Sequence, residues 1–323
     1  KLTNKKTFTF IPYVRSTQMD FLQHYLPWQP VEKNKHRSVG FRSSIKNKTQ
    51  KYQWVAGLDW EFTKGSLIEI QELPFSQNQP QGKHYDYEVN SNTGALFGHS
   101  NFRLTKFLAL EIGGRFERTE YDYNNQLSDG SACSAEATKG RCSRPTDQAD
   151  QFTDLSLNFA TSLQLNPKQI FYFRTARGFR APQTGELYRL QSDQLRASID
   201  SEKITSIELG WRGNDLGAFS FDTVFFKMNK DNVIFQDTKR YNIFGAKTSH
   251  YGIEASINAS FENGFYVNSA ITMARHRYDS SIELLGAKKN IDGNDIDTAP
   301  RFFGSIRIGW NSFTDRGLSQ LEG

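Results

Sequence analysis

Long stretches in which apolar and polar residues alternate limit the possible folds of this chain more than any other feature of its sequence. In residues 251–261 every odd position is apolar or aromatic, from Tyr251 to Phe261, while the even positions carry glycine, Glu254 and small polar residues. Alternation with a period of two places the two kinds of side chain on opposite faces of a β-strand. Residues 52–62 and 108–120 repeat the pattern. The sequence therefore predicts an all-β protein.

The predicted strands are long. Strands of soluble proteins usually have about five or six residues, whereas many of these stretches have about ten or more, enough for a tilted strand to cross a bilayer. Aromatic residues make up 14% of the chain although only 37% of it is hydrophobic, which fits sheets that are apolar on one face. Trp54, Trp60, Trp211 and Trp310 lie near strand ends, where membrane interfaces favour aromatic residues. About twelve strands are predicted from the alternation, near residues 5–15, 36–46, 52–62, 92–103, 108–120, 150–163, 168–178, 202–213, 217–229, 251–261, 264–277 and 300–311.

The connections between the predicted strands alternate between short turns and long polar loops. Short turns are expected at residues 166–169, 212–217 and 261–265, and long loops at 63–91, 122–149, 180–201, 230–247 and 278–298. Outer-membrane barrels have short periplasmic turns and longer extracellular loops. The alternation therefore predicts an antiparallel, up-and-down transmembrane β-barrel in which residues 168–178 run outward. A short helix is predicted within a loop at residues 18–26.

Charged residues on the polar strand faces are predicted to point into the barrel, because an arginine or lysine that faces lipid at the bilayer midplane costs about 2–4 kcal/mol. Two interpretations remain open for them: a water-filled lumen lined by compensating pairs, or a surface that contacts a plug and moves ligand past it. The residues concerned are Glu111, Arg115, Glu117, Glu208, Arg212, Glu254 and Arg307.

The remaining composition excludes several classes of function. The net charge is +5, from 40 basic and 35 acidic residues interspersed along the chain, so no nucleic-acid partner is predicted. Cys133 and Cys142 lie in a polar stretch and are predicted to form a small extracellular disulfide loop, with two free thiols as the alternative. The six histidines lack metal-ligand spacing and no nucleophile–base signature is present, so neither a metal site nor an enzyme is predicted.

An ordered series of motifs resembles the β-barrel of TonB-dependent outer-membrane receptors. The series spans residues 168–311 and begins with "RGFRAP" followed by "ELY". The residues that match this first signature are Phe173, Arg174, Gly178, Phe179, Arg180, Ala181, Pro182, Glu186, Leu187 and Tyr188. Later matches follow in the family's order at Glu202, Lys203, Glu208, Leu209, Gly210 and Gly213, and then at Asn242, Gly245, Ala246, Gly252, Ile253 and Glu254.

The resemblance implies that residues 1–323 form a partial barrel of such a receptor, without its plug domain, its TonB box and its first and last barrel strands. The chain opens without Met or an apolar signal region, so it is expected to be a piece of a longer protein. A complete barrel of this type has about 22 strands around a plug.

The intact protein is then expected to lie in the outer membrane of a Gram-negative cell and to take up a scarce solute, above all a ferric siderophore, with energy delivered by TonB. The expected partners are the ferric siderophore, the TonB complex and the lipid bilayer, and no cofactor is expected because the ferric chelate would be the transported ligand. A passive porin-type barrel is the alternative function, and a soluble all-β binding module is a third.

Two sets of candidate site residues follow. The first is the motif, expected to have a structural role at the outer rim, where Arg177 and Arg180 would reach headgroups, plug or loops; it comprises Arg177, Gly178, Phe179, Arg180, Ala181, Pro182, Glu186, Leu187 and Tyr188. The second set consists of aromatic and basic residues in the expected loops, which suit anionic ferric chelates: Trp28, His84, Tyr85, Tyr87, Tyr121, Tyr123, Arg189 and Tyr241. No histidine lies between Pro182 and Glu202, which disfavours a haem-specific receptor.

Overall fold

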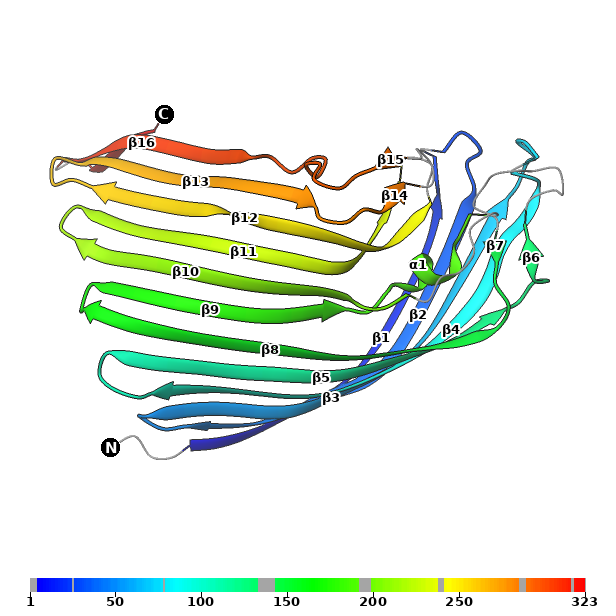
Figure 1. Ribbon diagram of the computed structural model, residues 1–323, viewed down its shortest axis with the longest axis horizontal. Helices are drawn as coiled ribbons and strands as arrows, with labels where there is room; N and C mark the ends of the chain where they lie inside the picture. Colours follow the sequence, from blue (N-terminus) through cyan, green and yellow to red (C-terminus); the bar gives the residue numbers. More distant parts are fainter. Residues whose placement is uncertain are drawn as a thin grey trace.

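The computed structural model describes residues 5–24, 26–77, 79–132, 143–191, 199–237, 241–284, 289–314 and 317–322. Within these ranges thirteen strands form one antiparallel sheet, in which each long strand pairs with the next one along the chain (Figure 1). The strands are β1 (Lys5–Leu22), β2 (Val31–Lys48), β3 (Tyr52–Gln71), β4 (Gly82–Arg103), β5 (Leu108–Asn125), β8 (Gln148–Asn166), β9 (Gln169–Arg180), β10 (Glu202–Leu216), β11 (Phe219–Gln236), β12 (Asn242–Ser260), β13 (Phe265–Tyr278), β16 (Phe302–Thr314) and β17 (Gly317–Glu322). The predicted all-β, up-and-down antiparallel sheet is confirmed, with β17 added to the predicted strands.

Short elements occupy some of the connections. The hairpins β6 (Gly130–Ser131) with β7 (Ser143–Arg144), and β14 (Glu283–Leu284) with β15 (Lys289–Asn290), lie outside the main sheet, and α1 (Thr184–Tyr188) is the one helix of the described ranges. The predicted helix at 18–26 is wrong, because Gln18–Leu22 continue β1 and pair with β2. No helix in the described part of the chain has the length and apolar character needed to cross a membrane.

One face of the sheet, here called the outward face, is apolar and exposed. A row that crosses four strands in register illustrates it: Leu58, Leu96, Phe116 and Leu155 pair in turn, and each side chain is 40–58% exposed. Soluble monomers rarely expose apolar patches of more than a few hundred square ångströms. An apolar face that extends over this many strands is the surface that a bilayer covers.

The opposite face is polar and is called the inward face. Arg115 on β5 binds Asp59 of β3 at 2.8 Å and Glu117 at 2.7 Å, so neighbouring charges compensate one another. Gly210 leaves room for the ring of Tyr172 on the adjacent strand, since a Cβ there would lie 2.0 Å from the ring carbon Cζ. The prediction that the charged strand faces point inward is confirmed by this register.

The connections alternate in length as predicted. Turns such as those at 167–168 and 217–218 lie at one end of the sheet, and the longer connections, such as 126–147 and 181–201, lie at the other (Figure 1). Two of the predicted long loops, 63–91 and 230–247, are wrong in extent. Strands β3, β4, β11 and β12 continue through most of those residues and leave only 72–81 and 237–241 as connections. Past the apolar band the alternation continues in β4 with its direction reversed. Tyr85, Tyr87 and Val89 face inward and Asp86, Glu88 and Asn90 face outward, so an apolar outward face no longer marks the strand.

The sheet curls without closing. Strands β1–β4 turn away from the plane of β8–β13 (Figure 1), and the edge strands β1 and β17 do not pair with each other. The main buried cluster of the described residues lies at the outer end, where α1 packs on β4, β5 and β8. Its members are Tyr85, Tyr87, Val89, Tyr123, Phe152, Leu187 and Tyr188.

Candidate ligand site at the outer mouth of the barrel

Arg180, the last residue of β9, binds the outer end of that strand to the neighbouring elements. Its guanidinium donates from Nε to Glu202 of β10 at 2.7 Å and from Nη1 and Nη2 to the two carboxylate oxygens of Glu186 in α1, at 2.9 and 3.0 Å. Glu202 in turn accepts from the backbone N–H of Ile234 on β11 at 2.7 Å. Bidentate arginine–carboxylate bonds are among the stronger hydrogen bonds in proteins, so Arg180 and Glu202 together link β9, β10 and β11 to α1.

Arg177 lies apart from this network. Its register partners are Leu157 and Thr205 on the outward face, whereas Arg180 pairs with Glu202 on the inward face. The two arginines of the motif therefore point to opposite sides of the sheet, because they are three positions apart along the strand. Arg177 is exposed beside the apolar band, and the structural role expected of it stays a prediction.

The helix α1 begins at Gln183, directly after the buried Pro182. Glu186 accepts from the backbone N–H of Gln183 at 2.6 Å, the reciprocal bond of a capping box. Leu187 and Tyr188 are fully buried. Tyr188 donates to Asp150 of β8 at 2.8 Å and stacks on Tyr123 with ring centroids 4.2 Å apart. The "ELY" segment thus packs the β9–β10 connection onto the inward face of the barrel.

The tyrosines expected in long loops lie in strands instead. Tyr85 and Tyr87 belong to β4, and Tyr121 and Tyr123 belong to β5. Tyr85 and Tyr123 are 1% exposed. Mainly because it is buried, the Tyr123 phenol has a pKa above its ordinary value. The prediction that these tyrosines lie in loops was wrong, because β4 and β5 extend beyond the apolar band from which the strands were predicted. Contact of these tyrosines with a ligand stays a prediction.

Arg189, just after α1, reaches across to two other strands. It donates to Glu32 of β2 at 3.0 Å and to Glu69 of β3, and its guanidinium lies over the Tyr85 ring at 5.1 Å from the centroid. Burial alone would lower the pKa of Arg189, but the carboxylates of Glu69 and Glu32 outweigh it and hold the pKa above its ordinary value. The β9–β10 connection is therefore tied to β2 and β3 by a buried, charge-compensated contact.

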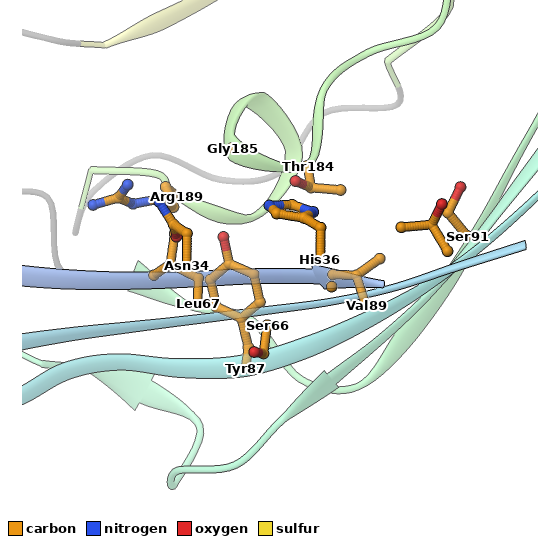
Figure 2. A pocket seen from close by; sticks show the side chains of 12 residues that line it. Asn34, His36, Ser66, Leu67, Tyr87, Val89, Ser91, Thr184, Gly185 and Arg189 are labelled. Atoms are coloured by element: carbon orange, nitrogen blue, oxygen red, sulfur yellow. The ribbon is translucent and has the colours of Figure 1, made fainter. Parts of the chain in front are cut away.

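A cavity of about 320 Å³ lies between α1 and the strands β2, β3 and β4. Figure 2 shows Tyr87 and His36 directed from the strands toward α1, with Thr184, Gly185 and Arg189 on the opposite side. Aromatic, imidazole, hydroxyl and guanidinium groups thus meet around a space of the size that small-molecule sites have. Asn34, His36 and Thr184 were not singled out in the sequence. Asn34 pairs with Leu67 and His36 pairs with Gly65 of β3, so the pairing of β2 with β3 identifies both as inward residues.

The other candidates are dispersed. Trp28 lies in the β1–β2 connection with its ring 6.0 Å from that of Phe75, and Tyr241 lies in the β11–β12 connection, both as expected of loop residues. His84 is a buried β4 residue whose Nδ1 is 3.4 Å from Glu69. Cys133 and Cys142 lie outside the described residues, so their disulfide stays a prediction. Within the described ranges no three His, Cys, Asp or Glu side chains are grouped to hold a metal ion.

Comparison with known proteins gives one family and many similar structures. The family model described as "TonB dependent receptor-like, beta-barrel" matches residues 3–321. Among solved structures, the ferric yersiniabactin uptake receptor FyuA from Yersinia pestis superposes with a TM-score of 0.67 at 14% identity, covering 100% of this chain and 47% of that one.

Two further structures show the same fold. The ferric citrate transporter FecA in its unliganded form has a TM-score of 0.69 at 15% identity and covers 95% and 44% of the two chains. The copper transporter OprC has a TM-score of 0.71 at 12% identity and covers 95% and 48%. This chain thus spans about half the length of these relatives. No curated protein sequence matches it.

Proposed function

This chain belongs to the TonB-dependent receptor family as part of its outer-membrane β-barrel, and we propose that the intact protein takes up a ferric siderophore with energy delivered through TonB. The receptor would bind the ferric chelate at its extracellular mouth and release it inward when TonB acts on a plug domain. No step of this proposal requires an enzymatic reaction. The proposal extends to the whole receptor, of which this chain forms a part of the barrel.

The observation that carries the proposal is the cavity beneath α1. His36, Tyr87 and Arg189 line it together, at the outer end and on the inward face of the barrel. Ferric siderophores are large, often anionic chelates on which aromatic rings such as that of Tyr87 stack. Several structural relatives are named as receptors for such chelates, among them the ferripyoverdine receptor of Pseudomonas aeruginosa and the ferric preacinetobactin receptor BauA of Acinetobacter baumannii.

A passive pore fits the mouth less well. Residues 181–191, which follow β9, fold across it and are fixed by the Arg180 network, by Tyr188 and by Arg189. A pore for free diffusion has a water-filled lumen, whereas here a buried aromatic cluster lies at the inward face of the mouth. This arrangement favours a receptor that holds its ligand over one that lets solutes through.

Binding to cells that display the intact receptor tests the proposal. A panel of catecholate, hydroxamate and carboxylate ferric siderophores is offered, and binding is normalised to receptor at the surface. Replacing Tyr87 by Ala is expected to make the free energy of binding of the chelate about 1–3 kcal/mol less favourable, since aromatic side chains are typical anchors. The Tyr251→Phe variant on the outward face is the matched control.

The same assay separates ligand contact from support of the barrel. The Arg180→Ala variant is expected to reduce the amount of folded receptor while leaving binding per receptor intact, because Arg180 binds Glu186 and Glu202 within the barrel. If Arg180→Ala abolishes binding at normal receptor level and Tyr87→Ala changes nothing, the two roles are reversed. If no ferric siderophore binds the wild-type receptor, the proposed ligand class is wrong.

A further inference from the structure

Three arginines converge on a single carboxylate, and two of them, Arg275 and Arg277, occupy outward positions of β13. Asp295, in the connection between β13 and β16, accepts from Nε of Arg301 at 2.9 Å and also from its Nη2. The Nε atoms of Arg275 and Arg277 each lie 3.8 Å from the other oxygen of Asp295. Three positive charges thus meet one negative charge. Lys227 lies in the same outward row, because it pairs with Tyr251, the register partner of Arg275.

Two of these guanidiniums keep donors without acceptors. A separation of 3.8 Å is too long for a hydrogen bond, and the Nε atoms of Arg275 and Arg277 are shielded from solvent without a hydrogen-bond partner. A shielded donor that lacks an acceptor costs about 1–3 kcal/mol, more when it is charged. Asp295 therefore compensates the positive charge of the cluster only in part.

The position of the cluster relative to the membrane is fixed by register. On β13 the outward residues run from Phe265 at the short turn to Met273, which pairs with Phe302. These nine residues match the length that a tilted strand needs to cross the hydrocarbon core. Arg275 and Arg277 are the next two outward positions, and Arg301 directly precedes Phe302. The three side chains consequently lie at the level of the lipid headgroups on the side of the long loops.

The segment that supplies Asp295 is held against β13 by its backbone. Tyr278 donates to the carbonyl oxygen of Asn294 at 2.9 Å, and Ile296 donates to that of His276 at 3.0 Å. Asp295 is therefore fixed between these two bonds and keeps the three guanidiniums within reach of one another despite their mutual repulsion. Arg301 is 63% exposed and Arg275 is 40% exposed, so a ligand can approach from the membrane side.

We propose that Arg275, Arg277 and Arg301 form a binding site for a phosphate monoester on the outward face of the barrel. A phosphate offers three or more acceptor oxygens and up to two negative charges, which match the excess positive charge of the cluster and its exposed Arg275 and Arg301 side chains. The headgroup of a membrane lipid and free inorganic phosphate both carry this chemistry. The site is independent of the ligand cavity beneath α1, because it lies on the other face of the sheet.

The test uses the intact receptor in a phosphate-free, non-ionic detergent. Short-chain phosphatidic acid, a lipid phosphate monoester, and inorganic phosphate are titrated separately, and the bound fraction is read by native mass spectrometry. The Arg275→Gln/Arg277→Gln variant is expected to bind phosphatidic acid about tenfold or more weakly, because charge-assisted arginine–phosphate bonds are lost. Arg275→Lys/Arg277→Lys is expected to lie in between, since lysine keeps the charge but lacks the planar fork.

The matched control is Arg118→Gln. Arg118 also lies on the outward face, but its donors already bind Glu120 and Gln151, so its removal should leave binding unchanged. Binding of phosphatidic acid alone supports the site with a lipid headgroup as the ligand, and equal binding of inorganic phosphate supports it with a soluble anion. Failure of wild-type receptor to bind either, equal binding of phosphatidylcholine, or an equal loss in Arg118→Gln would overturn the proposal. Far-UV circular dichroism establishes that the compared variants are folded. If the Arg275→Gln/Arg277→Gln variant is unfolded, Arg275→Lys/Arg277→Lys is compared with the wild type instead.

Discussion

The contacts of Glu202 show how one side chain at the end of a strand sets the sensitivity of the outer mouth to pH. Burial alone would raise the pKa of this carboxyl, but the hydrogen bonds from Arg180 and from the backbone N–H of Ile234 hold it below its ordinary value. A carboxyl with a lowered pKa stabilises the folded state above the pKa of the unfolded chain, about 4.3. That contribution is lost as the pH falls through the lower, folded-state pKa.

The first prediction therefore concerns acidification. The midpoint of thermal unfolding of the intact receptor is expected to fall as the pH drops below about 4, and the Glu202→Gln variant is expected to show a smaller fall from a lower starting point. Glu88→Gln is the matched control, because Glu88 is an exposed partner of Lys64 on the outward face. Identical pH profiles for wild type and Glu202→Gln would contradict the assigned role of this carboxyl.

At the scale of the element, α1 and the residues that follow it act as one docked unit. Leu187 is fully buried within the cluster formed with Tyr85, Tyr123 and Phe152. Replacing a buried leucine by alanine removes packing and leaves a cavity, which costs about 2–5 kcal/mol. Because α1 has only five residues, it is too short to persist without this packing.

The second prediction follows for Leu187→Ala. Amide hydrogen exchange in the peptide containing Glu186 and Leu187, whose N–H groups bond to the Gln183 carbonyl at 2.9 and 3.1 Å, is expected to speed up by about tenfold or more. Peptides from the middle of β5 are expected to keep their protection. Leu104→Ala, in an exposed turn, is the control and should change neither. Unchanged exchange at α1 in the Leu187 variant would show that its docking does not depend on this side chain.

The elements also show what sequence can and cannot predict. The membrane parts of the strands were predictable, because residues such as Leu96 and Phe116 alternate with polar neighbours. The strand positions of Tyr85 and Tyr123 were missed, because there the aromatic residues face inward and the polar residues outward, the reverse of the membrane part. The Arg180 contact with Glu202 required the register of β9 on β10, and the convergence of Arg275 and Arg301 on Asp295 required the path of a connection. Each is a long-range relation that local patterning does not encode.

For the whole molecule, the sheet separates two environments that use different chemistry. The outward face presents rows such as Leu58–Leu96–Phe116–Leu155 to lipid, with the arginine cluster at its outer border. The inward face carries compensated charges along the barrel and the cavity of His36, Tyr87 and Arg189 at the mouth. This division is what an outer-membrane receptor needs, since the same strands must be stable in lipid and bind a polar ligand.

The most direct measurement of the central claim is uptake of a radiolabelled ferric siderophore by cells that produce the intact receptor, compared between TonB-active and TonB-deficient strains at equal surface receptor. We expect binding to be the same in both strains and accumulation inside the cell to occur only where TonB is active. Accumulation at the same rate in both strains would contradict it, because a barrel that admits the chelate without TonB is a passive pore and not an energised receptor.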